Sequence, residues 1–293
     1  MSYFSISIDD ACSMDGKIAI VTGGSSGIGL ATVQLFLARG ATVISADLQP
    51  PVVAIDSSSF SYFPLDVTSW TSLCKLFEQI YTAHGRIDIV YANAGIYSRT
   101  DLFDLKHNEN DGTLQEPSKF TFQVNLFSVA NQISLAAHYM MWQSPKGGNI
   151  ILTASSTGYV RWEEADYASS KHGVIGLLRS TSMHAKSSAL PIRINAVAPS
   201  WTRTGLVTLS EGEFQKLGVE SQAPEEVARG VALPATDEER SGQCLYIRGG
   251  QATELEEPMH AEMLKRFRLS GLGEEAERVK VMDVLMQKAV AQA

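Results

Sequence analysis

The sequence predicts an α/β fold, a single doubly wound domain built on a mostly parallel, seven-stranded sheet. Short β-rich runs alternate with helical stretches along most of the chain, and this alternation is typical of βαβ units. Several runs, such as residues 149–153, are apolar almost throughout, which favours a sheet covered by helices on both faces. The expected strands lie at residues 17–22, 41–46, 60–65, 87–92, 149–153, 192–197 and 243–248.

The first expected strand leads into a glycine-rich turn, TGGSSGIG at residues 22–29, and then into a helical pattern. This context predicts a Rossmann-type dinucleotide site, because glycines let the backbone approach a pyrophosphate and the helix N-terminus attracts its charge. The next strand is followed by Asp47. A carboxylate there can accept hydrogen bonds from the ribose hydroxyls of NAD, and it repels the 2′-phosphate of NADP.

Tyr167 and Lys171 are four residues apart in a helical stretch, so they share one helix face. A nearby ammonium stabilises a phenolate and lowers the pKa of a tyrosine from its usual value of about 10. Ser155, just after an apolar run, can offer its hydroxyl to the same reacting oxygen. Together they predict a proton-transfer site for an alcohol or a carbonyl. The alternative is an ordinary helix with a surface tyrosine and lysine.

Between residues 16 and 250 the chain resembles the short-chain dehydrogenase/reductase family, whose motifs occur here in family order. After the glycine turn come Asp66-Val67, which in the family lies against the adenine, then Asn93-Ala94-Gly95 and the helix residue Asn125. Residues 193–199 resemble the strand that leads to the nicotinamide. Residues 167–180 also resemble the prostaglandin-dehydrogenase-like branch of the family.

The resemblance implies catalysis by Asn125, Ser155, Tyr167 and Lys171. Tyr167 takes the alcohol proton as hydride moves to the nicotinamide, and Ser155 hydrogen-bonds to the reacting oxygen. Lys171 also holds the nicotinamide ribose, and Asn125 keeps a water that passes protons to solvent. The implied cofactor residues are Gly23, Ser25, Ser26, Gly27, Ile28, Gly29, Asp47, Leu48, Asp66, Val67, Asn93, Ala94, Gly95, Tyr167, Lys171, Pro199, Ser200, Thr202 and Thr204.

The chain departs from the family pattern at two places. Ser200 follows Pro199 where the family usually has glycine, which is required only if φ is positive there. The spacing from the catalytic serine to the tyrosine is also one residue shorter than usual. Anchoring on Gly158 and on the preceding strand favours Ser155, and Ser156 remains the alternative.

The substrate is expected to be a bulky, largely apolar secondary alcohol or its ketone. Four aromatic residues near motif ends are candidates for the pocket, beside Ser155: Tyr97, Tyr159, Trp162 and Trp201. Several of them could instead belong to the core or to an interface. Two other functions stay open. One is an NAD-binding scaffold with a non-redox role in cyclisation, isomerisation or regulation, since fold alone does not establish function. The other is an NADP-linked ketoreductase.

Composition and sequence pattern argue against several other functional classes of protein. The 293 residues carry 24 Lys plus Arg against 32 Asp plus Glu, with no basic stripe of the kind that binds nucleic acid. No stretch approaches the roughly 20 apolar residues of a membrane span. Residues 1–14 lack the basic and apolar regions of a signal peptide. Three isolated cysteines and scattered histidines show no metal-ligand spacing. A cytoplasmic homodimer or homotetramer is the expectation.

The core domain is expected over residues 16–253, with a substrate loop at 202–224. Residues 97–119 include a polar patch and are expected to form an extended connection. Residues 254–293 are expected to be a helical C-terminal extension of the same domain, with helices at 259–269 and 274–290. The apolar stripe of the second helix must be buried somewhere, against its own subunit, a dimer partner or the active site.

Overall fold

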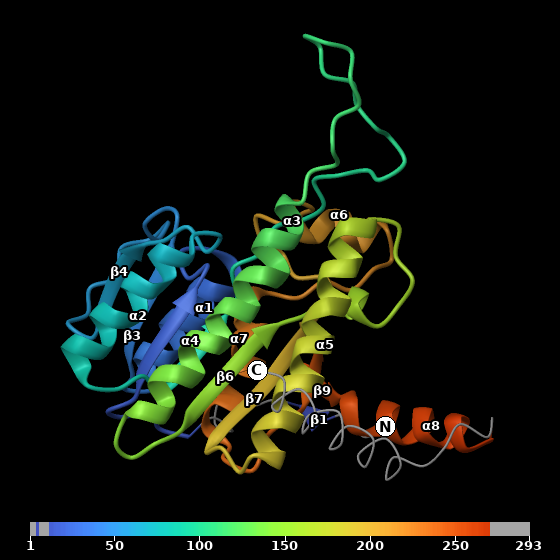
Figure 1. Ribbon diagram of the computed structural model, residues 1–293. Coiled ribbons are helices and arrows are strands. Elements are labelled where there is room, and N and C mark those ends of the chain that lie inside the picture. The colour runs from blue at the N-terminus through green and yellow to red at the C-terminus, as the bar shows by residue number, and fades with distance from the viewer. Residues whose placement is uncertain (1–3, 6–11, 270–293) are drawn as a thin grey trace, which may run out of the picture.

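The computed structural model describes residues 4–5 and 12–269 and confirms the predicted α/β fold class. The described strands form one nine-stranded sheet in the order β1-β9-β8-β7-β6-β5-β2-β3-β4 (Figure 1). They are β1 (Phe4–Ser5), β2 (Ile18–Thr22), β3 (Thr42–Asp47), β4 (Phe60–Pro64), β5 (Ile89–Ala92), β6 (Gly148–Thr153), β7 (Ile192–Pro199), β8 (Cys244–Arg248) and β9 (Gln251–Glu254). The longer helices are α1 (Gly27–Ala38), α2 (Trp70–His84), α4 (Ser128–Trp142), α5 (Ala165–Ser187), α7 (Pro224–Thr236) and α8 (Glu256–Leu269).

The seven predicted strands are β2 to β8, and every pairing among these seven is parallel. Two further strands extend the sheet beyond β8: β9 pairs antiparallel with β8, and β1 pairs antiparallel with β9. Sequence pattern did not predict either, since β1 has two residues and β9 has four. Strands that short show too little alternation to stand out from loops.

Helices cover both faces of the sheet, as a doubly wound fold requires. One buried cluster joins α2, α4 and α5 to the sheet through residues such as Phe77, Ile133 and Leu178. The other joins α1 and α7 to the opposite face through residues such as Phe36 and Val231. The central strands β2, β5 and β6 between these layers are almost wholly buried, which explains why they are apolar nearly throughout.

Local signals set the helix boundaries. The Ser69 hydroxyl accepts a hydrogen bond from Ser72 N at 3.2 Å and begins α2, while Gly85, at φ +71°, ends it in the left-handed region. Helix α7 begins with Pro224 at its first turn, where the Glu226 carboxylate accepts from Ala223 N at 2.7 Å.

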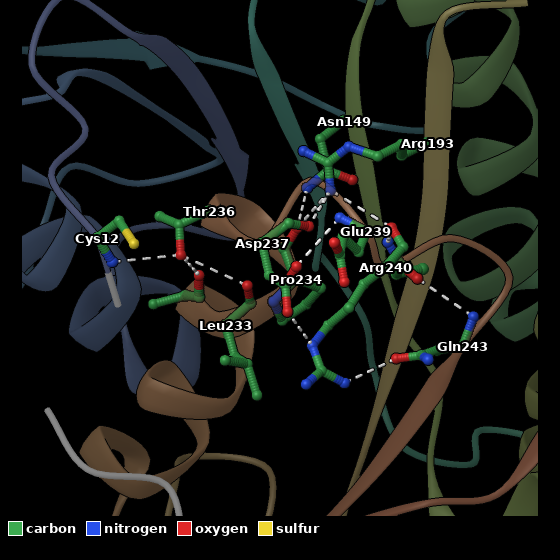
Figure 2. A network of polar contacts seen from close by, with 12 residues as sticks. Cys12, Asn149, Arg193, Leu233, Pro234, Thr236, Asp237, Glu239, Arg240 and Gln243 are labelled. Carbon is green, nitrogen blue, oxygen red and sulfur yellow. Dashed lines mark hydrogen bonds and ion pairs between the residues drawn. The ribbon is translucent and has the colours of Figure 1, made fainter. Parts of the chain in front are cut away.

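A polar network ties the C-terminal end of α7 to the amino ends of β6 and β7 (Figure 2). Asn149 Nδ2 and Arg193 Nη1 both donate to the carbonyl of Pro234, which lies inside α7. Arg193 Nη1 also donates to Asp237 O at 2.6 Å, and Arg240 Nη1 donates to Gln243 Oε1 at 2.8 Å. The network lies at the amino edge of the sheet, so the carboxyl edge remains for the loops that form the site.

Two segments outside the sheet match their predictions in outline. Residues 97–119 form an extended connection that projects from the body in Figure 1, with an isolated bridge between His107 and Leu114. The helix expected at 259–269 is α8 and begins three residues earlier; the helix expected at 274–290 lies outside the described residues. In the part of the chain that is described, no helix combines the length and apolarity that crossing a bilayer demands.

Candidate active site

The glycine turn after β2 is packed too tightly for side chains. A Cβ atom on Gly29 would overlap the carbonyl oxygen of Gly23, and one on Gly23 would lie 2.8 Å from Ala94 Cα. Gly23 and Gly27 also have positive φ, at +64° and +51°. The turn therefore needs glycine for both space and conformation, and it presents bare backbone at the start of α1.

Asp47, the last residue of β3, lies beside this turn. Its Oδ2 accepts a hydrogen bond from Ser25 N at 3.1 Å and its Oδ1 accepts one from Leu48 N at 2.7 Å. These contacts hold the carboxylate between the glycine turn and the end of β3. A carboxylate fixed there suits the ribose hydroxyls of a dinucleotide.

Asn93 connects the turn after β5 to the glycine turn. Its Nδ2 donates to Thr22 O at 3.0 Å and to Gly23 O at 3.2 Å, while its Oδ1 accepts from Thr153 Oγ1 at 3.1 Å. Thr22 Oγ1 accepts in turn from Asn93 N at 3.1 Å. The carboxyl ends of β2, β5 and β6 are thus joined by hydrogen bonds between residues that lie far apart in the sequence.

Tyr167 is buried near the start of α5, with the Ser155 hydroxyl beside its phenol. Burial raises the pKa of Tyr167, the Ser155 hydroxyl lowers it, and the neighbouring Tyr97 raises it. The rings of Tyr97 and Tyr167 lie with their centroids 5.0 Å apart. Ser155, rather than Ser156, is therefore the hydroxyl beside the phenol.

Lys171 lies one turn further along α5 and is 4% exposed. Its Nζ donates to Thr153 O at 2.8 Å and stands 5.8 Å from the centroid of the Tyr167 ring. Burial lowers the pKa of Lys171 to about 8. The sequence predicted that Lys171 lowers the pKa of Tyr167, but Ser155 is the group that lowers it here and burial outweighs it. The reason is that the ammonium is directed at a backbone carbonyl and is itself desolvated.

Asn125 lies in a π-helical turn, η2 (Gln123–Phe127), between the short α3 (Phe120–Phe122) and α4. Its Oδ1 accepts from Ile96 N and its Nδ2 donates to Ile96 O, both at 2.9 Å. Nδ2 also donates to Ser170 Oγ at 3.2 Å. The side chain thereby clamps the backbone that follows Asn93-Ala94-Gly95 to helix α5. Such π-helical turns inside helices are frequent at functional sites.

Ser200, which replaces the usual glycine, does not adopt a positive φ; among the described residues other than glycine, Ala189 alone does. The Ser200 backbone N–H donates to Ile247 O at 2.9 Å, which continues the pairing of β7 with β8. Thr202 Oγ1 closes the start of the following loop by donating to Ser200 O at 2.8 Å. A serine is therefore tolerated at this turn without backbone strain.

A cavity of about 720 Å³ lies at the carboxyl edge of the sheet and brings most of the predicted residues together. Ser155, Tyr167 and Lys171 line it. So do these residues predicted for the cofactor: Gly23, Ser26, Gly27, Ile28, Asp47, Leu48, Asp66, Val67, Asn93, Ala94, Gly95, Pro199, Ser200, Thr202 and Thr204. Ser25, Gly29 and Asn125 are not in the lining; Ser25 and Asn125 support it through the hydrogen bonds described above.

A profile of the short chain dehydrogenase family matches residues 17–213. The chain belongs to this family. It is 38% identical over 281 residues to the short-chain dehydrogenase/reductase ascJ of Acremonium egyptiacum, an alignment that covers 94% of each chain. It is 33% identical over 264 residues to the (+)-cis,trans-nepetalactol synthase NEPS2 of Nepeta racemosa, covering 81% of this chain and 94% of that one. Among solved structures it is similar to aldohexose dehydrogenase of Thermoplasma acidophilum, with a TM-score of 0.66, 27% identity, and coverage of 83% of this chain and 94% of that one.

Short-chain dehydrogenases bind nicotinamide dinucleotides, and the residues of this chain fit such a cofactor. The glycine turn exposes backbone where a Cβ atom would collide, and the Asp47 carboxylate is fixed next to it. The cavity continues from there to Tyr167 and Lys171. In the described residues no cluster of three or more His, Cys, Asp or Glu could hold a metal ion.

Among the four aromatic residues predicted for the substrate, three line the cavity and one does not. Tyr97, Trp162 and Trp201 line it, and the two tryptophan rings lie 5.8 Å apart between centroids. Tyr159 is not in the wall: its hydroxyl donates to Glu256 Oε1 at 2.7 Å, at the start of α8. Proximity to Ser155 in sequence suggested a pocket residue, but the short helix η3 (Ser156–Gly158) intervenes between them.

Sequence reasoning missed two residues beside the site. Arg99 lines the cavity near the start of the extended connection, where no motif draws attention to it. Asp166 is fully buried next to Tyr167 and accepts hydrogen bonds from Ser98 Oγ at 2.6 Å and Thr121 Oγ1 at 2.7 Å. An aspartate directly before Tyr167 was the available signal, because a carboxylate on that helix face must be paired if it is buried.

Proposed function

We propose that this chain is an NAD-dependent oxidoreductase that transfers a hydride between the nicotinamide and a bulky, largely apolar secondary alcohol or its ketone. The observation that carries the proposal is the convergence of Ser155, Tyr167 and Lys171 on the same cavity as the glycine turn and Asp47. A protein that only bound the dinucleotide would gain nothing from a paired hydroxyl and phenol at the far end of that cavity.

In the oxidising direction, Tyr167 Oη accepts the proton of the alcohol, and the Ser155 hydroxyl donates a hydrogen bond to the same substrate oxygen. The bound nicotinamide supplies the hydride acceptor for oxidation and the hydride donor for reduction. Lys171 places a positive charge beside the phenolate that forms. Asn125 positions these groups, because it holds the backbone at Ile96 against α5. In the reducing direction, Tyr167 returns the proton.

Asp47 supports NAD over NADP. Its carboxylate is fixed by two backbone N–H groups at the end of β3, and a 2′-phosphate would meet a second negative charge there. The cations that line the cavity are Lys171 and Arg99, within the described part of the chain, and neither belongs to the glycine turn or to the end of β3.

Bulky apolar substrates are supported by the wall beyond Tyr167. Trp162, Trp201 and Tyr97 line it together with the aliphatic Val160 and Leu206. Pockets that take ring-bearing ligands are mostly apolar, with a few polar groups that set orientation.

We further propose that the chain acts as a cytoplasmic homodimer or homotetramer.

A titration of the purified protein with NADH and NADPH, read by cofactor fluorescence, tests the cofactor assignment first. We expect NADH to bind at least about tenfold more tightly, a difference near 1.4 kcal/mol. A preference for NADPH would overturn the role of Asp47, and unchanged NADH affinity in Asp47→Ala would do the same. A screen of ring-bearing ketones with NADH then tests the chemistry.

A non-redox reaction is the second candidate, because one similar protein is named a nepetalactol synthase rather than a dehydrogenase. If the NADH-loaded protein converted a substrate without any change in the absorbance of the nicotinamide, that result would favour a non-redox reaction. Consumption of NADH in proportion to product would exclude it.

A further inference from the structure

The charges around the cavity are unevenly distributed. Its acidic lining residues are Asp47 and Asp66, at the end beside the glycine turn. Its basic lining residues are Lys171 and Arg99. Lys171 is buried and donates to Thr153 O at 2.8 Å, so it is already engaged. The Arg99 guanidinium forms no ion pair with any residue that the structure describes. An unpaired cation in a cavity wall is available to a ligand.

Arg99 is held in place by the buried carboxylate of Asp166. Asp166 Oδ2 accepts hydrogen bonds from Arg99 N at 3.0 Å and Thr100 N at 3.2 Å, and Oδ1 accepts from Ser98 Oγ at 2.6 Å. The same carboxylate accepts from Tyr167 N at 2.7 Å. The backbone of Arg99 is therefore fixed relative to the phenol that we propose as the acid–base group.

Arg99 belongs to the substrate end of the cavity rather than the cofactor end. It follows Tyr97 by two residues, and the Tyr97 ring lies 5.0 Å from the Tyr167 ring between centroids. The pyrophosphate is expected at the glycine turn, at the other end of the cavity. Two acidic residues lie near the segment that carries Tyr97 and Arg99. The Asp166 carboxylate already accepts several hydrogen bonds, and Glu164 interacts with the Tyr97 hydroxyl.

We propose that the substrate carries a carboxylate, which the Arg99 guanidinium binds while the rings of the substrate contact Trp162 and Trp201. This inference rests on the proposed function and narrows its substrate to ring-bearing hydroxy or keto acids. A planar guanidinium presents parallel N–H groups that match a carboxylate in bidentate fashion. The aromatic wall takes the apolar body, and Arg99 fixes which end of it enters.

The test uses one pair of probe ketones of nearly equal shape, 6-acetyl-2-naphthoic acid and its methyl ester, with NADH as the reductant. We expect the wild-type protein to reduce the acid with kcat/KM about tenfold higher than the ester. Arg99→Gln should remove that preference by raising KM for the acid, with kcat and the values for the ester unchanged. Arg161→Gln is the matched control, because Arg161 is an exposed arginine nearby that does not line the cavity.

Three results would overturn the proposal. They are a wild-type preference for the ester, equal kcat/KM values of the wild type for both probes, or an equal fall in kcat/KM for both probes in Arg99→Gln. Increasing salt should also reduce the preference for the acid, because Arg99 is exposed to solvent.

A binding arm separates failure of this inference from failure of the proposed function. Calorimetric titration of the NADH-saturated protein with 2-naphthoate and with methyl 2-naphthoate needs no turnover. Tighter binding of the carboxylate that is lost in Arg99→Gln would support the anion site even if neither ketone were reduced, and the negative turnover result would then count against the proposed redox function alone. Equal binding of both probes would overturn the anion site by itself.

Discussion

Tyr167 is the residue on which the proposed chemistry depends. Replacing it with Phe removes the acid–base group and leaves the ring, so turnover should fall by about 10² to 10⁴ while NADH affinity changes little. Because burial raises the pKa of Tyr167, alcohol oxidation should increase as pH rises, and carbonyl reduction should be favoured at lower pH. Steady-state rates against pH in both directions measure this. Full turnover in Tyr167→Phe would show that another group transfers the proton.

Lys171 makes stability depend on pH in a predictable direction. Burial lowers its pKa to about 8 from 10.5, so between these values the unfolded chain binds more protons than the folded protein. The free energy of unfolding should therefore rise with pH, by about 1 kcal/mol between pH 7.5 and 9. Above pH 9 the buried Cys244 thiol, whose pKa is raised to about 12, opposes the trend. Denaturant unfolding of wild type and Lys171→Met at several pH values measures this change. The free energy of unfolding of the variant should not increase with pH in this range.

Asp166 is a positioning residue for the substrate side of the site. Asp166→Asn keeps the shape of the side chain but turns an N–H₂ group toward donors, so we expect a loss of about 2 to 3 kcal/mol in the free energy of unfolding. KM for any ring-bearing substrate should rise more than NADH affinity falls. Asp101→Asn is the control, since Asp101 is an exposed carboxylate that accepts from Phe103 N. Equal effects of the two substitutions would contradict the assignment.

At the residue scale, sequence motifs predicted which side chains meet at the cavity but not their electrostatics. The four-residue spacing placed Tyr167 and Lys171 on one helix face. It could not show that Lys171 Nζ is directed to Thr153 O, because that contact depends on the position of β6. Tyr159 was misplaced for the same kind of reason, since its partner Glu256 is 97 residues away in the sequence.

At the scale of single elements, the junction between β2 and α1 is the most constrained. Gly29→Ala would drive a methyl group into the carbonyl of Gly23, so we expect a loss of about 1 to 3 kcal/mol in stability and at least tenfold weaker NADH binding. Gly176→Ala is the matched control: this glycine also lies in a helix, α5, with open space around it. There alanine should be neutral or stabilise by up to about 1 kcal/mol. Thermal unfolding and NADH titration of both variants decide the matter.

Elements were predictable where burial on both faces made the pattern strong. The strands β2, β5 and β6 are buried along almost their whole length, and each was expected from an apolar run. The strands β1 and β9 were not expected, because short antiparallel additions are selected by pairing with a distant edge rather than by their own sequence. The π-helical turn at Asn125 was also missed, since its extra residue leaves no local signature.

At the scale of the whole molecule, the cavity joins the two halves of the sheet. Its wall includes the glycine turn from the first half and residues 199–202 and 204–207 from the second. A ligand that spans both should therefore stabilise the domain as one unit, by about 2.7 kcal/mol when NADH is present at 100 times its Kd. Amide hydrogen exchange should slow both around Gly27 and around Thr202. Protection confined to the glycine turn would mean that NADH does not reach the second half of the cavity, and the placement of Pro199, Ser200 and Thr202 beside the nicotinamide would then be wrong.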